Sequence, residues 1–236
     1  MTLLITRPLS DSGDLIAALS ARGHAVIAAP LFDIAYTDGP EIAVSNYQGV
    51  LATSANGVRA LARRTKERTT PIFAVGDATA REAQSLGFEA VRSADGDVSS
   101  LANLIMMANL PVDRPLLHVA GTVVAGDLAG TLTKTGYTVE RIVLYEACPR
   151  QRLSDAAEHA LRLHEISGIL VYSPRTGRLL VDAVKRAALE GNLTTVTLFA
   201  LSNAVAAACN DLAWRDIRVA RHPTSEELLA TLDGGV

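Results

Sequence analysis

The sequence is poor in cysteine and aromatic residues, and it contains no long hydrophobic run. Its two cysteines, Cys148 and Cys209, match neither a disulfide framework nor a metal-binding pair, so we interpret them as buried, reduced thiols of a cytoplasmic protein. No stretch of about 18 apolar residues is present, and the first residues, MTLLITRP, do not form a signal-peptide pattern. We therefore expect no membrane span.

A basic excess, nucleotide-binding motifs and metal-ligand spacings are missing as well. The 22 Lys and Arg residues are outnumbered by 25 Asp and Glu residues, so the net charge of −3 does not favour nucleic acid as a partner. The segment GDATA (76–80) lacks both the lysine of a P-loop and the glycine spacing of a dinucleotide fingerprint. None of the five histidines has a ligand-like spacing to another histidine or cysteine, and we interpret all five as surface or packing residues. We expect no metal and no cofactor. The sequence also shows no arrangement of serine, histidine and an acidic residue that would indicate a hydrolase.

Three segments of the chain recur once each, in the same order and at nearly constant separations. The pairs are 3–26 with 116–139, 50–61 with 169–180, and 73–80 with 199–206. This repetition predicts an internal duplication, with two similar domains of roughly 110 residues that face one site. Repetition alone suggests a boundary near residue 112.

Short apolar runs alternate with helical patterns along the chain. The runs LLIT (3–6), GVLAT (49–53) and IFAV (72–75) each precede a segment with apolar residues at helical spacing. Alternation of this kind predicts an α/β fold with doubly wound parallel sheets.

Polar residues stand where several of the predicted strands end and helices begin. Ser54 and Ser173 occupy such corners, and Pro174 suits the first helical position. Gly76 and Asp77 open another helix, with Thr79 in its first turn. Each corner alone is explained by helix capping. Their recurrence in both halves favours a second role, because free amides and the positive end of a helix dipole bind carboxylates at the carboxyl edge of a parallel sheet.

Two short extended segments, 30–40 and 143–151, end in polar residues and proline and suit connectors between domains. They are related by the repeat, with Phe32 equivalent to Tyr145.

Taken in order, several segments resemble the uroporphyrinogen-III synthase family. They are LLITRP (3–8), VLATSANGV (50–58), FAVGDATA (73–80), LLHVAG (116–121), IVLYEACP (142–149) and GILVYSP (168–174). The resemblance covers nearly the whole chain. It implies two flavodoxin-like domains, residues 1–33 plus 149–236 and residues 38–143, joined by linker strands at about 33–38 and 143–149.

The implied activity is that of a lyase, a hydro-lyase of tetrapyrrole biosynthesis that serves haem, sirohaem and cobalamin. The implied substrate is hydroxymethylbilane, a linear tetrapyrrole with eight carboxylates, which is cyclised with loss of water and inversion of ring D. Pyrrole electrons perform most of this chemistry, which agrees with the missing acid/base cluster. The resemblance also implies a cytoplasmic monomer, in transient contact with the preceding enzyme of the pathway.

For individual residues, the resemblance implies that Tyr145 assists departure of the hydroxyl group, although packing between the connectors also explains an aromatic residue there. The positions implied to bind substrate are Arg7, Thr53, Ser54, Asn56, Gly76, Thr79, Gly121, Ser173, Arg175 and Ser202. Arg7 and Arg175 are candidate carboxylate partners, with a solvated surface position as the alternative. Asn56 occupies a place that is often arginine in relatives. The sequence departs from the family at LSNAVA (201–206), where Ser202 replaces a glycine and Ala204 and Val205 replace threonines, so hydroxyl donors are lost there.

Two other classes of protein also fit the sequence. A non-catalytic two-domain protein that binds an anionic small molecule would use the same duplicated domains and polar corners. A structural or interaction protein is the third class, and the polar residues at the strand ends count against it.

Overall fold

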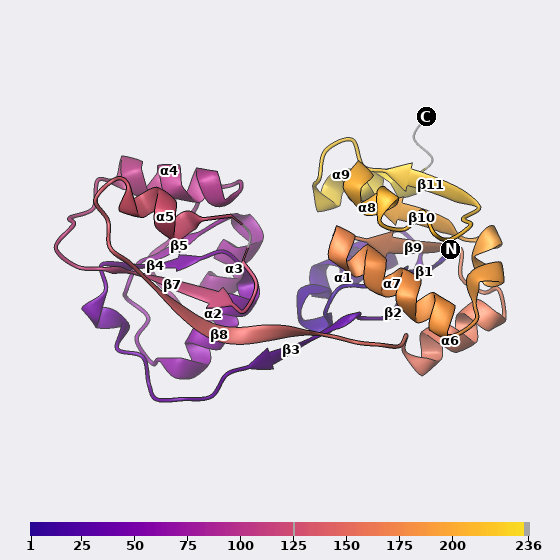
Figure 1. The fold of residues 1–236 in the computed structure, drawn as a ribbon, viewed down its shortest axis with the longest axis horizontal. Helices are drawn as coiled ribbons and strands as arrows, with labels where there is room; N and C mark the ends of the chain where they lie inside the picture. The colour runs from indigo at the N-terminus through magenta and orange to yellow at the C-terminus, as the bar shows by residue number, and fades with distance from the viewer. Residues whose placement is uncertain (125, 234–236) are drawn as a thin grey trace. The chain divides into compact units, whose positions relative to one another are not determined.

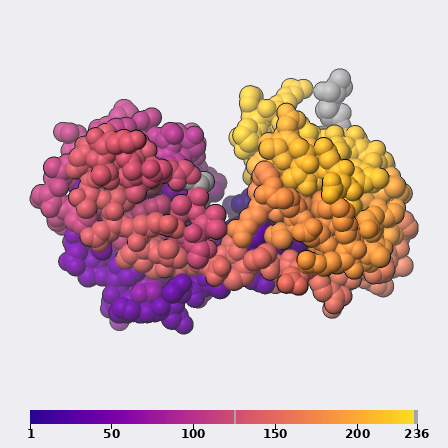
Figure 2. Space-filling model, in the orientation of Figure 1, coloured from indigo at the N-terminus to yellow at the C-terminus, as the bar shows by residue number. Residues whose placement is uncertain are grey.

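The computed structural model describes residues 1–124 and 126–233, which form two compact units. Unit 1 comprises Met1–Asp33 and Cys148–Val236, and unit 2 comprises Ile34–Ala147. The chain therefore passes twice between the units, once within β3 (Phe32–Tyr36) and once within β8 (Val139–Pro149). The colours of Figures 1 and 2 show this directly, because unit 1 carries both ends of the colour scale and unit 2 carries the middle.

Unit 1 is built on a five-stranded parallel sheet in the order β11-β10-β9-β1-β2. Its strands are β1 (Thr2–Ile5), β2 (Ala25–Ala28), β9 (Gly168–Val171), β10 (Thr197–Ala200) and β11 (Asp216–Val219). Its helices are α1 (Gly13–Ala21), α6 (Asp155–Arg162), α7 (Pro174–Arg186), α8 (Asn203–Ala207) and α9 (Ser225–Ala230), with 3-10 turns η1 (Leu9–Asp11), η3 (Glu190–Thr195) and η4 (Thr231–Asp233). The central strands β9 and β10 are buried throughout, as expected for parallel strands covered on both faces.

Unit 2 is built on a six-stranded sheet in the order β3-β8-β7-β4-β5-β6, in which the strands from β4 to β8 pair in parallel. The remaining strands are β4 (Gly49–Ala52), β5 (Ile72–Ala74), β6 (Val91–Ser93) and β7 (Leu116–Gly121). The helices are α2 (Ala55–Arg64), α3 (Asp77–Ser85), α4 (Val98–Ala108) and α5 (Leu128–Thr133), with the 3-10 turn η2 (Val44–Asn46).

Helices cover both faces of each sheet, and each face has its own hydrophobic core. In unit 1, α6, α7 and α8 pack on one face and α1 and α9 on the other. In unit 2, α2 and α3 cover one face, while α4 and α5 cover the opposite one (Figure 1). The prediction of doubly wound parallel sheets is confirmed in both units. No helix among the described residues combines the length and the apolar character that a membrane crossing needs.

The two sheets have the same strand order once the repeat is taken into account. Reading from one edge, unit 1 runs β2-β1-β9-β10-β11 and unit 2 runs β8-β7-β4-β5-β6. Each pair of repeated segments contributes one member to each unit, but unit 1 takes the first segment from the start of the chain and the other two from its end. No unit boundary lies near residue 112. The two units therefore have equivalent folds, but neither unit corresponds to one half of the sequence. The first strand-helix-strand segment of the first half belongs to unit 1, and the equivalent segment of the second half belongs to unit 2.

The two cysteines are unpaired thiols, but they differ in burial. Cys209 lies in the core beneath α7 and α8, and burial raises the pKa of its thiol to about 11. Cys148 is only half-buried, so its expected burial was wrong. It lies near the end of β8, where every residue after Leu144 is exposed or only partly buried.

Candidate functional site

In unit 2 the predicted polar corners lie at the carboxyl ends of β4 and β5. The Ser54 side chain caps α2 by accepting a hydrogen bond from the Asn56 backbone N–H at 3.1 Å. Gly76 occupies the capping position of α3 and offers no side-chain acceptor to the first turn, where Thr79 is buried. The start of α3 therefore presents the positive end of the helix dipole without a side-chain cap. The exposed carboxylate of Asp77 stands in this first turn, so a bound anion would share the dipole with it and bind through the backbone N–H groups.

The side chain of Asn56 belongs to a hydrogen-bonded network that the sequence did not predict. Its Oδ1 accepts from a terminal nitrogen of Arg59 at 3.0 Å and from the hydroxyl of Tyr36 at 3.5 Å. Arg59 also makes a two-point ion pair with Glu82 of α3, with distances of 2.9 and 2.7 Å. The network orients the Asn56 amide and ties the first turn of α2 to α3. The one feature of the sequence that could have indicated this network is that Arg59 follows Asn56 by three positions, which places both residues on one face of a helix.

Thr53 follows β4 and meets a buried histidine on the neighbouring strand β7. Its hydroxyl lies 3.3 Å from Nε2 of His118, which is 4% exposed. Burial lowers the pKa of His118 to about 4, with a smaller contribution in the same direction from the positive charge of Arg141 on β8. The imidazole is therefore neutral at physiological pH and holds the Thr53 hydroxyl in place. The sequence predicted only surface or packing roles for the histidines, and this one is buried next to a predicted site residue.

Tyr145 of β8 lies against Gly121, the last residue of β7. The backbone N–H of Thr122 donates to the Tyr145 carbonyl at 3.1 Å, and Arg141 donates to the Gly121 carbonyl at 2.7 Å. The structure thus brings together, within unit 2, the predicted catalytic residue and a predicted substrate-binding residue.

In unit 1 the predicted serines are also helix caps. Ser173 accepts from the Thr176 backbone N–H at 3.1 Å and shares a hydrogen bond of 2.8 Å with the Thr176 hydroxyl. Ser202 caps the five-residue helix α8 through the Val205 N–H at 3.4 Å. The capping explanation is therefore confirmed for Ser54 and Ser173, and Ser202 is a helix cap as well. As caps, the serine oxygens accept hydrogen bonds, so their hydroxyl groups can still donate to a ligand. The exception is Ser173, whose hydroxyl shares a hydrogen bond with the hydroxyl of Thr176.

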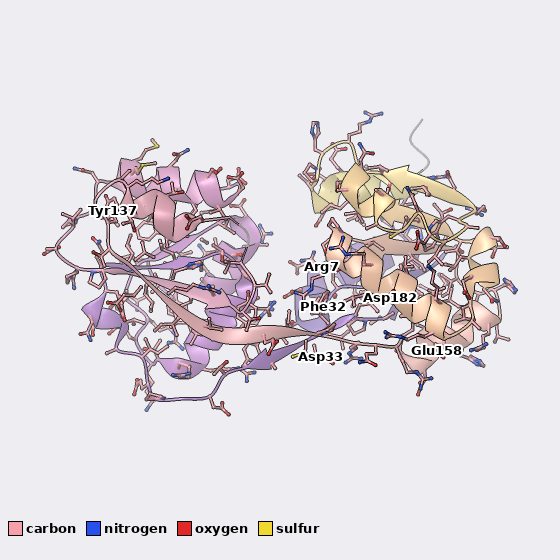
Figure 3. All side chains as sticks on the ribbon, in the orientation of Figure 1. Arg7, Phe32, Asp33, Tyr137, Glu158 and Asp182 are labelled. Atoms are coloured by element: carbon pink, nitrogen blue, oxygen red, sulfur yellow. The ribbon has the colours of Figure 1, made fainter. Side chains whose placement is uncertain are left out.

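Both predicted arginines of unit 1 lie over aromatic rings, Arg7 as a half-buried residue and Arg175 as an exposed one. The Arg7 guanidinium lies 4.8 Å from the ring centre of Tyr172, and that of Arg175 lies 4.6 Å from the ring centre of Phe32. Figure 3 marks Arg7 and Phe32 in this unit. Burial raises the pKa of Tyr172 to about 12. The positive charge of Arg7 opposes that rise in the pKa. The buried hydroxyl makes no hydrogen bond of standard geometry among the described residues.

These groups are suited to binding carboxylates and to hydrogen bonding. Within residues 1–124 and 126–233, no three His, Cys, Asp or Glu side chains converge on a possible metal site. Both units contribute hydroxyl groups and helix starts, and unit 1 adds the guanidinium groups of Arg7 and Arg175, which match a polycarboxylate ligand.

The model of the family described as "Uroporphyrinogen-III synthase HemD" matches residues 13–230 of the chain. The chain belongs to the uroporphyrinogen-III synthase family. A uroporphyrinogen-III synthase of Salmonella typhimurium is 28% identical over 248 residues, which cover 98% of this chain and 100% of that protein.

Solved structures of uroporphyrinogen-III synthases have the same fold. The Helicobacter pylori protein matches with a TM-score of 0.66 and 15% identity, over 99% of this chain and 98% of its own. A mutant of the Thermus thermophilus protein matches with a TM-score of 0.50 and 18% identity, over 99% of this chain and 97% of its own. At such identities the likeness concerns the fold alone, and the roles of individual residues depend on the geometry described above.

Proposed function

We propose that this member of the uroporphyrinogen-III synthase family cyclises hydroxymethylbilane to uroporphyrinogen III, with loss of water and inversion of ring D. The observation that carries the proposal is the repeated placement of helix starts and hydroxyl groups at the carboxyl ends of both duplicated sheets. Such an arrangement offers many separate binding points, as a substrate with eight carboxylates requires.

In the proposed reaction, the Tyr145 phenol donates its proton to the terminal hydroxyl of the substrate as the carbon–oxygen bond breaks. Water leaves, and the pyrrole nitrogen of ring A supplies electrons to give an azafulvene cation. The substituted carbon of ring D attacks this cation, and the spiro intermediate breaks and recloses with ring D inverted. The carbon that closes the ring finally loses one proton, which balances the proton donated at the start. The protein's part is to fold the chain and to direct the attacking carbon.

The remaining polar groups have binding roles in this proposal. The starts of α2, α3 and α7 and the guanidinium groups of Arg7 and Arg175 hold carboxylates, while Thr53, Asn56 and Thr79 contribute hydrogen bonds. Ser202 caps α8, and its hydroxyl and the amides of that turn bind substrate in place of the lost threonine hydroxyls.

Incubation of the protein with freshly prepared hydroxymethylbilane, followed by separation of the porphyrin isomers, tests the proposal. We expect the type III isomer in excess over the type I isomer that forms spontaneously. Tight binding of the substrate with only type I product would instead identify the non-catalytic binding protein, and absence of both binding and turnover would indicate an interaction protein.

We further propose that the protein acts as a cytoplasmic monomer and needs neither metal nor cofactor. Two unpaired thiols, one of them buried, suit a reducing compartment. Because hydroxymethylbilane closes spontaneously, a transient contact with the enzyme that releases it would limit the loss. Type III formation should survive treatment with a chelator, and sedimentation should give the mass of a single chain.

A further inference from the structure

The pairing of β7 with β8 contains one irregularity, and it lies at Tyr145. The two strands are in register from Leu116 opposite Val139 to Ala120 opposite Val143, and then Gly121 pairs with Tyr145. Leu144 is therefore an extra residue on β8, which is the definition of a β-bulge.

The bulge changes the face of the sheet toward which Tyr145 points. Ile142 and Leu144 pack into the core beneath α2, so strict alternation would send Tyr145 to the opposite face. Tyr145 nevertheless packs against that same core. The extra residue thus turns the phenol toward the face where α2 begins.

The first turn of α2 lies against the same end of β7. A Cβ atom at Gly57 would lie 2.8 Å from the carbonyl oxygen of Val119, two residues before Gly121. The bulge therefore places Tyr145 on the side of the sheet that carries the Ser54 and Asn56 corner.

Gly121 supplies the space in which the Tyr145 ring lies. A Cβ atom at position 121 would lie 2.8 Å from both Cε2 and Cζ of the ring and 3.2 Å from its hydroxyl oxygen. All three atoms belong to the outer end of a half-buried side chain, which can swing aside while the backbone stays in place. The backbone at this point is held separately by the Thr122–Tyr145 and Arg141–Gly121 hydrogen bonds.

From this geometry we infer that Gly121 is a positioning residue for Tyr145: its missing side chain, together with the bulge at Leu144, determines where the phenol oxygen lies. The inference rests on the proposed function, in which that phenol protonates the departing hydroxyl. Displacement of a catalytic group by about 1 Å lowers a rate by up to about a hundredfold.

The test is a double-mutant cycle with Gly121→Ala and Tyr145→Phe, measured as kcat and KM for type III formation. We expect Gly121→Ala to lower kcat about tenfold to a hundredfold, with little change in KM and a melting temperature within about 2 °C of the parent. The double variant should be no slower than Tyr145→Phe alone, because Gly121 acts through the phenol. Gly13→Ala is the matched control and should keep the parental kcat, since a Cβ atom there meets nothing within 4 Å.

The tyrosine ring resonances provide a readout that does not depend on activity. Tyr145 is assigned from the signal missing in Tyr145→Phe, and its ring signals should shift in Gly121→Ala while the other tyrosines keep theirs. Unshifted Tyr145 ring signals in Gly121→Ala would overturn the inference, and so would a Gly121→Ala variant with parental kcat or one that fails to fold. The inference would also fall if the two substitutions lowered kcat independently, so that their effects multiplied in the double variant, or if Tyr145→Phe kept full activity. A parent protein that makes no type III isomer would refute the proposed function instead, and the ring signals would then decide the positioning of Tyr145 by themselves.

Discussion

Arg59 of α2 and Glu82 of α3 form a two-point ion pair, with nitrogen–oxygen distances of 2.9 and 2.7 Å, that joins the two predicted corners of unit 2. The side chains are 16% and 23% exposed, so solvent screens the pair only in part. Because Arg59 also orients the Asn56 amide, the pair links helix packing to the candidate site.

We predict that Glu82→Gln raises KM for hydroxymethylbilane several-fold and changes kcat little, because Arg59 loses its fixed position while Tyr145 is untouched. The free energy of unfolding should fall by about 1 to 3 kcal/mol, as expected when a charged hydrogen-bond partner is removed from a partly buried pair. The control is Asp211→Asn, which breaks the exposed pair with Lys185 and should alter neither quantity measurably. An unchanged KM in Glu82→Gln would show that the network has only a structural role.

For Tyr145→Phe we predict a loss of about two to four powers of ten in the rate of type III formation, with normal folding. The phenylalanine keeps the ring packing against Gly121 but cannot donate a proton. Rate and isomer ratio should be measured together after subtraction of spontaneous closure to type I. A variant with the parental rate would reduce Tyr145 to a packing residue of β8.

The serine caps should matter more for stability than for catalysis. Ser54→Ala and Ser173→Ala each remove one acceptor at a helix start, so each should lower the free energy of unfolding by about 1 kcal/mol in urea titrations. Both should keep most of the type III activity, because the amides that bind carboxylates remain. If either variant folds normally but is inactive, the hydroxyl takes part in chemistry beyond capping.

His118 should make the stability of the protein depend on pH. Its pKa is about 4 in the folded protein, against 6.5 in a model peptide. As the pH falls from 6.5 to 4, the unfolded chain therefore binds a proton that the folded protein does not. The free energy of unfolding should fall by about 1 to 3 kcal/mol over this range. Urea unfolding at several pH values should show this loss in the parent and in the control His222→Gln, but less of it in His118→Gln, which keeps a hydrogen-bonding group for Thr53. Equal slopes in all three proteins would contradict the assignment.

The features that the sequence predicted correctly are those that depend on residues close to one another along the chain. Strand-helix alternation follows from hydrophobic periodicity, and the caps at Ser54 and Ser173 follow from the chemistry of a serine before a helix. The duplication is visible because equivalent segments retain similar residues. The residue roles, including those of Tyr145 and Arg7, came from the family resemblance and stay predictions.

By itself, then, the sequence determined the elements, their polar corners and the repeat, since these depend on residues a few positions apart. Only the tertiary structure decided which repeat segments share a sheet, because strand pairing between distant segments of the chain has no local signature. It also decided the partners of Thr53 and Asn56, which come from neighbouring strands and helices. The face occupied by Tyr145 is the clearest case, because one extra residue in the pairing of β7 and β8 reverses the orientation that alternation along β8 would predict.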